Sequence, residues 1–238
     1  MAATALHRIA KSTRPWMPSF LFDPLRAALT AVATPARFSF ATGHFRNSLA
    51  RTACSADGLP LPWYTYPAID FLAQREFKGR DVLEFGGGQS TLWWQTRARS
   101  VLTVEGDRDW YRRIVGRMGA NVNLHHVPVE PEDSLQQVRK VIEGHTTRKF
   151  DVIIIDGHRR RELAGLAFEY LAPGGAILLD NAEGYGFYEE TRARHCRRVD
   201  FFGFAPGVSL RHCTSLVFVD DCFLLMPDIA IPEIDEPA

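Results

Sequence analysis

Val82-Leu83-Glu84-Phe85-Gly86-Gly87-Gly88-Gln89-Ser90 is a short apolar run that leads into three glycines and two polar residues. The apolar run is typical of a buried strand, and Ser90 with Thr91 can cap a helix that follows. Glycines at such a junction let the backbone approach a ligand closely, and the start of the helix offers free N–H groups. The stretch therefore predicts a strand, a turn and a helix around a ligand. A glycine turn also joins strands to helices where nothing binds, so the pattern is weak by itself.

Short apolar segments alternate with helical segments from about residue 67 onward. This alternation is typical of parallel strands joined by crossover helices, and it predicts an α/β fold. The run 150–156 has no polar alternation, so we expect it to be buried on both faces of the sheet. The last two strands are close enough in sequence to form an antiparallel edge pair. The expected strands are 81–85, 101–105, 122–127, 150–156, 176–180 (after a turn at 173–175), 199–204 and 215–219, and the expected helices are 67–76, 90–96, 108–118, 134–143 and 160–171.

The chain divides into three predicted units, residues 1–60, 61–225 and 226–238. The stretch 56–62 marks the first boundary with an Asp-Gly pair and two prolines, and the last dozen residues are an acidic, Pro-rich tail that we expect to be loose. Residues 1–55 hold seven Arg or Lys and a single acid, Asp23, which is a net charge of about +6. This unit is also aromatic, so we expect it to form helices that cap the edge of the sheet.

Net charge, hydrophobicity and cysteine spacing limit the partners and the cellular compartment that we expect for the chain. Its 28 basic and 28 acidic residues balance, which gives no indication of nucleic acid as a partner. No apolar run approaches the roughly 20 residues that a bilayer span requires. The acid-poor N-terminus fits a mitochondrial transit peptide, but Pro15, Pro18, Pro24 and Pro35 are expected to interrupt any long amphipathic helix there. The four cysteines show no CxxC spacing, so we expect a cytoplasmic protein with reduced thiols.

A carboxylate ends the second expected strand. Glu105 lies about 20 residues beyond the glycines, where α/β folds bind ribose hydroxyls. The dinucleotide fingerprint GxGxxG fails here, because Thr91 stands where its third glycine is required. With Glu84 two residues before Gly86, the stretch 82–90 instead resembles the E/D-x-G-x-G motif of Rossmann-like (class I) S-adenosylmethionine-dependent methyltransferases.

Two later segments support this resemblance, which covers about residues 60–220. Residues 150–157 look like the fourth strand of that family, and residues 171–180 look like its L-x-P-G-G entry to strand five. The resemblance implies a seven-stranded, mostly parallel sheet with helices on both faces, in which only the last-formed edge strand is antiparallel. It also implies that the glycine turn lies against the methionine part of the cofactor and that Glu105 binds the ribose. The expected cofactor contacts are Tyr66, Glu84, Gly86, Gly87, Gly88, Ser90, Glu105 and Asp156.

Oxygen-bearing side chains follow strands four and five. Asp156 and the pair Asp180-Asn181 are similar to the residues with which catechol and caffeoyl-CoA O-methyltransferases hold a divalent metal, and such oxygens suit Mg²⁺. The chain departs from those enzymes at Arg159, where they carry a catalytic lysine, and an arginine remains protonated. A plain turn after strand five is the other interpretation of Asp180-Asn181.

The same edge of the sheet carries the expected catalytic residues. His158 follows Asp156 closely and is a candidate general base, since its pKa lies near working pH; it could instead orient Asp156 or only border the pocket. Tyr185 lies in a glycine-flanked loop after strand five and is a candidate substrate contact. The expected catalytic set is therefore Asp156, His158, Asn181 and Tyr185.

These observations predict an S-adenosylmethionine-dependent methyltransferase that moves the methyl group in line to O, N or C of a small-molecule acceptor. Positioning would supply most of the acceleration, with residues 1–60 shaping the acceptor pocket. Two alternatives stay open. One is another use of the same cofactor, such as internal alkyl transfer that cyclises it, and the other is a non-catalytic binding protein with this fold. A nicotinamide oxidoreductase is a more distant possibility.

Overall fold

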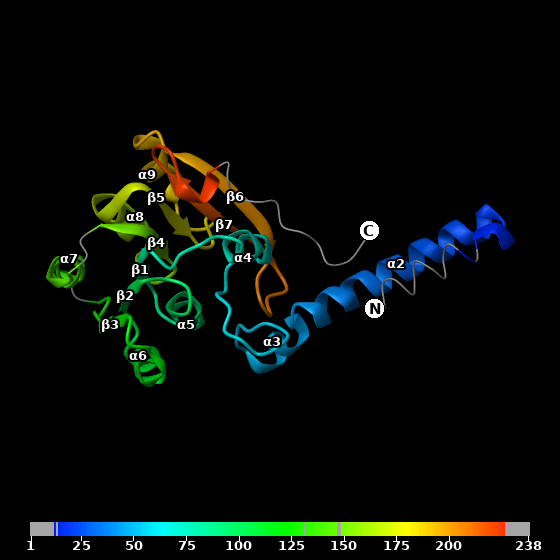
Figure 1. Cartoon of the computed structure of the whole chain (residues 1–238), viewed down its shortest axis with the longest axis horizontal. Coiled ribbons are helices and arrows are strands. Elements are labelled where there is room, and N and C mark those ends of the chain that lie inside the picture. The colour runs from blue at the N-terminus through cyan, green and yellow to red at the C-terminus, as the bar shows by residue number, and fades with distance from the viewer. Residues whose placement is uncertain (1–11, 13, 131, 147–148, 227–238) are drawn as a thin grey trace.

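The computed structural model describes residues 12, 14–130, 132–146 and 149–226. Within these ranges a seven-stranded sheet has the order β3-β2-β1-β4-β5-β7-β6, with helices on both of its faces (Figure 1). The strands are β1 Asp81–Phe85, β2 Ser100–Glu105, β3 Val122–His126, β4 Phe150–Ile155, β5 Leu171–Leu179, β6 Arg197–Phe204 and β7 Arg211–Phe218. The helices are α2 Ser19–Ala41, α3 His44–Ala50, α4 Tyr66–Ala73, α5 Gln89–Gln95, α6 Arg108–Ile114, α7 Ser134–Gly144, α8 Arg160–Tyr170 and α9 Phe187–Ala193, with 3₁₀ turns at Arg14–Trp16, Val115–Arg117 and Phe223–Leu225. The predicted α/β class and the expected strands and helices are confirmed, with bounds that shift by a few residues.

The centre of the sheet is parallel and buried on both faces. β1 pairs in parallel with β2 on one side and with β4 on the other. Successive side chains of β4 alternate between two cores, because neighbouring residues of a strand point to opposite faces. Val152 and Ile154 pack with Trp93 and Trp94 of α5, whereas Ile153 packs with residues of α7 and α8. The absence of polar alternation in β4 follows from these two cores.

The antiparallel strand lies inside the sheet instead of at its edge. β6 and β7 form the expected antiparallel pair, and β7 is also antiparallel to β5. Since β7 sits between β5 and β6, the edge strand β6 runs parallel to β5. The short connection 205–210 makes β6 and β7 a hairpin, and β7 is the strand of that hairpin that pairs with β5. The expected antiparallel direction of the last strand is therefore confirmed, and its expected position at the edge of the sheet is wrong.

The expected turn before the fifth strand is an irregularity inside β5. Leu171 pairs with Phe150, and regular pairing resumes only where Ala176 lies opposite Val152. Gly174 has a φ of 73°, which is the left-handed region that favours glycine. A β-carbon on Gly175 would lie 2.8 Å from the carbonyl oxygen of Asp151. The Pro-Gly-Gly sequence thus forms a bulge that aligns the end of β5 with the end of β4.

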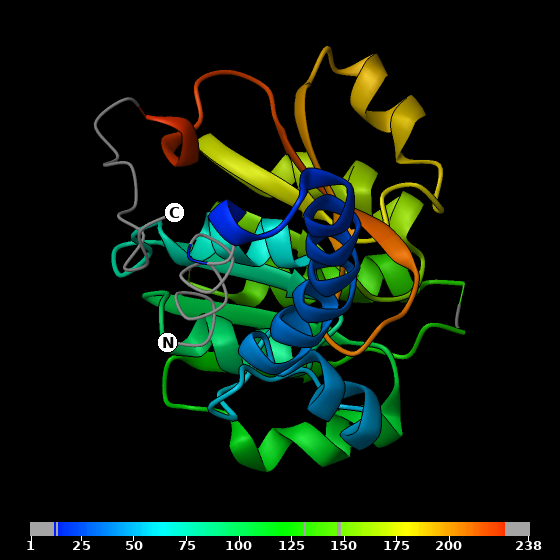
Figure 2. The ribbon, with the colours of Figure 1, turned by 90° about the vertical axis from the view of Figure 1, so that its right-hand side faces the viewer.

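The N-terminal unit contains one long helix. α2 runs for 23 residues with Pro24 and Pro35 inside it, so the expectation that prolines interrupt a long helix here is wrong. Each proline removes one backbone hydrogen bond, but the surrounding sequence is rich in alanine and leucine, which favour helix. α2 projects from the sheet domain in Figure 1, and in Figure 2 it points towards the viewer. None of the residues of α2 is buried, so this helix does not cover the edge of the sheet as we expected.

An aromatic cluster joins α2 and α3 to the sheet domain. Phe38, near the end of α2, packs edge-on against Tyr66 at 5.2 Å between ring centroids, and it also contacts His44 and Phe204. The Nδ1 atom of His44 accepts a hydrogen bond of 3.3 Å from the backbone N–H of Gly207. The junction thus fastens α2 and α3 to the loop between β6 and β7. Among the helices of the described residues, none is long and apolar enough to cross a membrane.

The core on the α4 and α5 side contains a buried hydrogen bond that can be tested. The indole N–H of Trp94 donates to the hydroxyl of Tyr64 at 3.2 Å, and both side chains are fully buried. We expect Tyr64→Phe to lower the free energy of unfolding by about 1–3 kcal/mol, because the indole N–H loses its acceptor where no water replaces it. Tyr185→Phe is the matched control, since that side chain is 47% exposed; its effect should stay within about 0.5 kcal/mol. Urea unfolding of the two variants and the wild type measures both, and equal effects would contradict the assignment.

Candidate functional site

A cleft of about 660 Å³ lies at the carboxyl ends of the parallel strands. Ligands of open α/β sheets bind at this edge, where helices begin and strands end. Most of the sequence-predicted site residues line the cleft: Gly86, Gly87, Gly88, Ser90, Glu105, Asp156, His158, Asp180, Asn181 and Tyr185. The structure therefore brings these residues to one place from five separate segments of the chain.

The glycine loop between β1 and α5 lies directly against the loop after β4. Gly86 has a φ of 95°, and a β-carbon there would lie 2.6 Å from the backbone nitrogen of Gly157. Only a glycine fits this approach without moving the β4 loop. The indole N–H of Trp110 donates to the carbonyl of Gly87 at 2.5 Å, which fixes the outer side of the glycine loop. The loop is thus held open towards the cleft from both sides.

Glu105 fastens the glycine loop to the end of β2. One carboxylate oxygen accepts the N–H of Gly87 at 2.7 Å, and the other accepts the N–H of Asp107 at 2.7 Å. Burial raises the pKa of Glu105, while these two N–H groups oppose that rise. A carboxylate has about four acceptor positions. Glu105 therefore keeps acceptor capacity for ligand hydroxyls in the cleft.

Glu84 lies behind the glycine loop and not in the wall of the cleft. Its Oε2 atom accepts hydrogen bonds from the hydroxyls of Thr91, at 2.5 Å, and Thr103, at 3.0 Å. Its Oε1 atom is buried and has no hydrogen-bond partner among the described residues. Burial raises the pKa of Glu84 to about 7. The predicted cofactor contact is therefore a buried, half-satisfied carboxylate beneath the loop.

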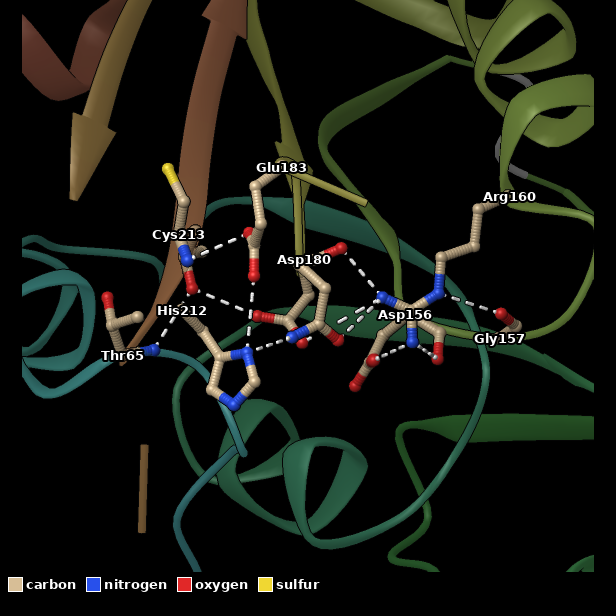
Figure 3. Close-up of polar contacts among 10 residues, drawn as sticks. Thr65, Asp156, Gly157, Arg160, Asp180, Glu183, His212 and Cys213 are labelled. Atoms are coloured by element: carbon tan, nitrogen blue, oxygen red, sulfur yellow. Dashed lines mark hydrogen bonds and ion pairs between the residues drawn. The ribbon is translucent and has the colours of Figure 1, made fainter. Parts of the chain in front are cut away.

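The guanidinium of Arg160 joins the ends of β4 and β5 (Figure 3). It donates to the carboxylate of Asp156 at 2.9 Å, to the backbone carbonyl of Asp180 at 2.6 Å and to Oδ1 of Asn181 at 3.1 Å. The Arg160 side chain is only 10% exposed, and its guanidinium lies 4.4 Å from the centre of the Tyr185 ring. In the sequence, the arginines at 159–161 resemble the solvated start of a helix or a group that attracts an anionic substrate, and neither interpretation predicts that Arg160 is enclosed between two strand ends.

The predicted Mg²⁺ ligands do converge, but they converge on this guanidinium. Asp156 and Asn181 direct oxygens to Arg160, and Oδ1 of Asp180 accepts the hydroxyl of Thr214 at 2.9 Å. No group of three or more His, Cys, Asp or Glu side chains that could hold a metal occurs in the described part of the chain. A positive guanidinium at this point also repels a divalent cation. The residues present therefore do not fit Mg²⁺, and the metal prediction is corrected.

Asp156 and Asp180 form a buried pair of acids beside Arg160. Burial raises the pKa of Asp156 well above its ordinary value, and the neighbouring charge of Asp180 raises it further. Burial also raises the pKa of Asp180, while Thr214 and Arg160 oppose that rise. The positive charge of Arg160 opposes the rise in pKa at both acids.

His212, at the start of β7, is a functional candidate that sequence analysis missed. Its Nδ1 atom lies 3.2 Å from a carboxylate oxygen of Glu183 and 3.1 Å from the amide nitrogen of Asn181. The other oxygen of Glu183 accepts the backbone N–H of Cys213 at 3.0 Å, which fixes the carboxylate. Figure 3 shows Nε2 on the far side of the ring from Glu183, and His212 lines the cleft. No motif surrounds His212, so only the pairing of β7 with β5 reveals it.

Three further predicted residues, His158, Asn181 and Tyr185, line the cleft. His158 is exposed and borders a second, apolar cavity of about 40 Å³ as well as the cleft. Asn181 has a φ of 50°, a left-handed conformation that asparagine tolerates better than most residues. This conformation lets one Asn181 side chain contact both Arg160 and His212.

Trp63 lines the cleft, whereas the expected cofactor contact Tyr66 does not. Tyr66 is 7% exposed and packs in the aromatic cluster with Phe38 and His44, so it does not line the cleft as expected of a cofactor contact. Trp63 lines the cleft, and its indole N–H donates to the carbonyl of Pro206 at 3.1 Å. The reason is that α4 begins at Tyr66 and turns its ring towards α2.

Comparison with known proteins gives structural likenesses only. No protein-family model and no curated protein matches the sequence. The O-methyltransferase from Bacillus cereus in complex with SAH is 16% identical, with 83% of this chain and 97% of that chain covered at a TM-score of 0.49. A methyltransferase from Pyrococcus furiosus is 20% identical over 73% of this chain and 94% of that chain, with a TM-score of 0.46. The tRNA (m1A58) methyltransferase TrmI from Aquifex aeolicus is 14% identical over 66% and 70%, with a TM-score of 0.44.

The architecture itself identifies the fold. Six strands run parallel, β7 alone runs against them, and helices cover both faces of the sheet. The glycine loop follows β1 and carries an acid two residues before its first glycine, and a second acid ends β2. The chain has the Rossmann-like fold of the class I S-adenosylmethionine-dependent methyltransferases.

Proposed function

We propose that the protein is an S-adenosylmethionine-dependent methyltransferase that acts on a small-molecule acceptor. The observation that carries this proposal is the negative charge around the glycine loop. Three buried acids, Glu84, Glu105 and Asp180, and the partly exposed Asp156 lie around the loop, and Glu84 keeps an unpartnered oxygen. Uncompensated buried carboxylates favour a cationic ligand. S-adenosylmethionine carries a sulfonium and an ammonium group, which suits such a site.

The cleft offers a place for each part of this cofactor. The ribose hydroxyls would bind the free acceptor positions of Glu105, and the methionine part would lie along Gly86–Gly88 above Glu84. The small apolar cavity adjoins the cleft at Gly86 and Gly157 and continues towards Val127 and Leu135. A flat adenine ring would lie on this apolar side. A cleft of about 660 Å³ has room for this cofactor together with a compact acceptor.

The acceptor would bind at the β5 and β7 side of the cleft, between Asn181, Tyr185 and His212. When bound, the cofactor supplies a methyl group whose bond to sulfur breaks with the electron pair left on sulfur. The role of His212 depends on its tautomer. In the tautomer whose Nδ1–H donates to Glu183, the Nε2 lone pair can take the proton of an acceptor hydroxyl or amine, whereas in the other tautomer Nδ1 accepts the N–H of Asn181 and Nε2 carries the proton. His212 is better placed for this than His158, which lies at the end of the cleft beside the apolar cavity.

Charge supports a small acceptor over a nucleic acid. Residues 56–238 hold 21 basic and 27 acidic side chains, which is a net charge of about −6. A polyanionic substrate would be repelled by such a domain. Positioning remains the main catalytic contribution, and Asp156 acts through Arg160, which holds the Tyr185 ring and Asn181 in place.

We expect S-adenosylmethionine and S-adenosylhomocysteine to bind the full chain. Glu105→Gln should lower the affinity for each by at least about tenfold. The reason is that the neutral amide accepts hydrogen bonds from the ribose hydroxyls less well and that its N–H group repels the N–H of Gly87. Isothermal titration calorimetry measures both affinities. Asp109→Asn is the matched control, since its side chain is 80% exposed beside the cleft, and its affinities should not change. Absence of binding in the high micromolar range would overturn the proposal. Release of methylthioadenosine from S-adenosylmethionine in the absence of any acceptor, in place of S-adenosylhomocysteine in its presence, would reveal internal alkyl transfer.

The raised pKa of Glu84 predicts a pH dependence of cofactor discrimination. Glu84 is largely neutral at about pH 6 and ionised at about pH 8, and S-adenosylmethionine has a sulfonium charge that S-adenosylhomocysteine lacks. The ratio of the two affinities should therefore shift several-fold towards S-adenosylmethionine as pH rises through about 7. Calorimetry over this range tests it, and Glu84→Gln should flatten the ratio.

The same group has the opposite effect on stability. The pKa of Glu84 is higher in the folded chain than in the unfolded chain, so the folded state binds more protons between about pH 4.5 and pH 7. The contribution of Glu84 to stability is therefore present at low pH and is lost as pH rises through about 7.

A ratio of S-adenosylmethionine to S-adenosylhomocysteine affinity that stays constant with pH in the wild type would contradict the placement of Glu84 beneath the bound cation.

A further inference from the structure

The helix α2 exposes an apolar face that the sheet domain does not cover. Leu21, Leu25 and Leu29 are each at least half exposed, and Val32 is 73% exposed. Phe40 is 75% exposed at the end of the helix. Single exposed leucines are common on protein surfaces and indicate nothing. Several large apolar side chains gathered on one exposed helix, in contrast, indicate a binding surface.

These residues form one stripe, and polar residues form the opposite one. Positions 21, 25, 29, 32, 36 and 40 recur every three or four residues, so they share a face of the helix. Ser19, Asp23, Arg26, Thr30, Thr34 and Arg37 recur in the same way about half a turn away. An apolar stripe opposite a stripe rich in Ser, Thr and Arg is typical of helices that lie in a membrane surface.

Aromatic residues stand at both ends of the stripe. Trp16 is 89% exposed just before α2, Phe20 is 73% exposed in its first turn, and Phe45 is 64% exposed in α3. Aromatic rings of this kind gather at the boundary between lipid tails and headgroups. The helix itself cannot cross a bilayer, so these features favour a helix that lies along the surface.

Charge separates a lipid surface from a second copy of this chain as the occupant. Residues 1–55 carry about +6 and residues 56–238 carry about −6. α2 itself holds Arg26 and Arg37 against Asp23, a net charge of about +1, and the rest of the positive charge of residues 1–55 flanks it in the sequence, so pairing α2 with the α2 of another copy would bring two positive stretches together. An anionic bilayer instead attracts residues 1–55 and repels the negatively charged sheet domain. In Figure 1, α2 projects away from that domain. We propose that α2 binds the surface of anionic phospholipid membranes, with its leucine stripe in the headgroup region.

Vesicle flotation of the full chain tests this proposal. We expect most of the protein to float with phosphatidylcholine vesicles that contain about 30% phosphatidylserine. Binding should fall at least about fivefold on pure phosphatidylcholine, or when salt is raised to about 1 M, because screening removes the electrostatic part of the attraction.

Matched variants separate the apolar stripe from the rest of the helix. Leu25→Gln with Leu29→Gln should weaken binding to anionic vesicles at least about tenfold, because it removes two apolar side chains without changing charge. Thr30→Gln with Thr34→Gln introduces the same residue on the polar stripe and should stay within about twofold of the wild type. Unchanged S-adenosylmethionine affinity or, if that is absent, an unchanged urea unfolding curve shows that the sheet domain of each variant is folded.

Three outcomes would overturn the proposal. The first is a wild-type chain that does not float with anionic vesicles. The second is equal loss of binding in the leucine and threonine variants, which would show that the apolar stripe is not the contact. The third is a dimer in analytical ultracentrifugation that Leu25→Gln with Leu29→Gln dissociates while flotation of the wild type is absent, which would assign the stripe to a second copy.

Discussion

The buried guanidinium of Arg160 is the contact on which the cleft depends. It bonds to the backbone carbonyls of Asp156, Gly157 and Asp180, so one side chain fixes the ends of both β4 and β5. Its positive charge also opposes the rise in pKa that burial gives the two neighbouring acids. Through Asn181 the same guanidinium sets which atom of the amide faces His212, because Oδ1 is already engaged. A cation supplied by the chain thus organises the corner at which the sequence predicted a metal.

Electrostatic balance then explains why the cleft suits a positively charged ligand. Arg160 compensates the acids at β4 and β5, whereas Glu84 behind the glycine loop lacks a full set of partners. A buried carboxylate in this state costs free energy, and a bound cation would recover part of that cost. Under the proposed function, this half-satisfied acid serves ligand binding, and the free energy that its burial costs is a loss of stability at the site.

The sequence predicted the features that depend on local pattern. The glycine loop, Glu84 and Glu105 could be found because a strand, a turn and a helix leave a periodic signature. His212 could not, since it reaches the cleft only through the pairing of β7 with β5, and strand order is not encoded locally. Arg160 was missed for a similar reason, because a helix start and a buried cation have the same local sequence. The prediction that Pro24 interrupts a long helix was wrong, because the helix propensity of the surrounding alanine and leucine residues outweighs the loss of one backbone hydrogen bond.

The position of α2 and the position of the acceptor side of the cleft are mechanically connected. Phe38 and His44 pack on Tyr66 and Phe204, and His44 accepts the N–H of Gly207. The loop that contains Gly207 also provides Ala205 and Val208 to the wall of the cleft. Under the two proposals, the contact that ties α2 to the sheet domain thus also carries part of the wall beside which we place the acceptor, so membrane binding through α2 would act on the cleft through this loop.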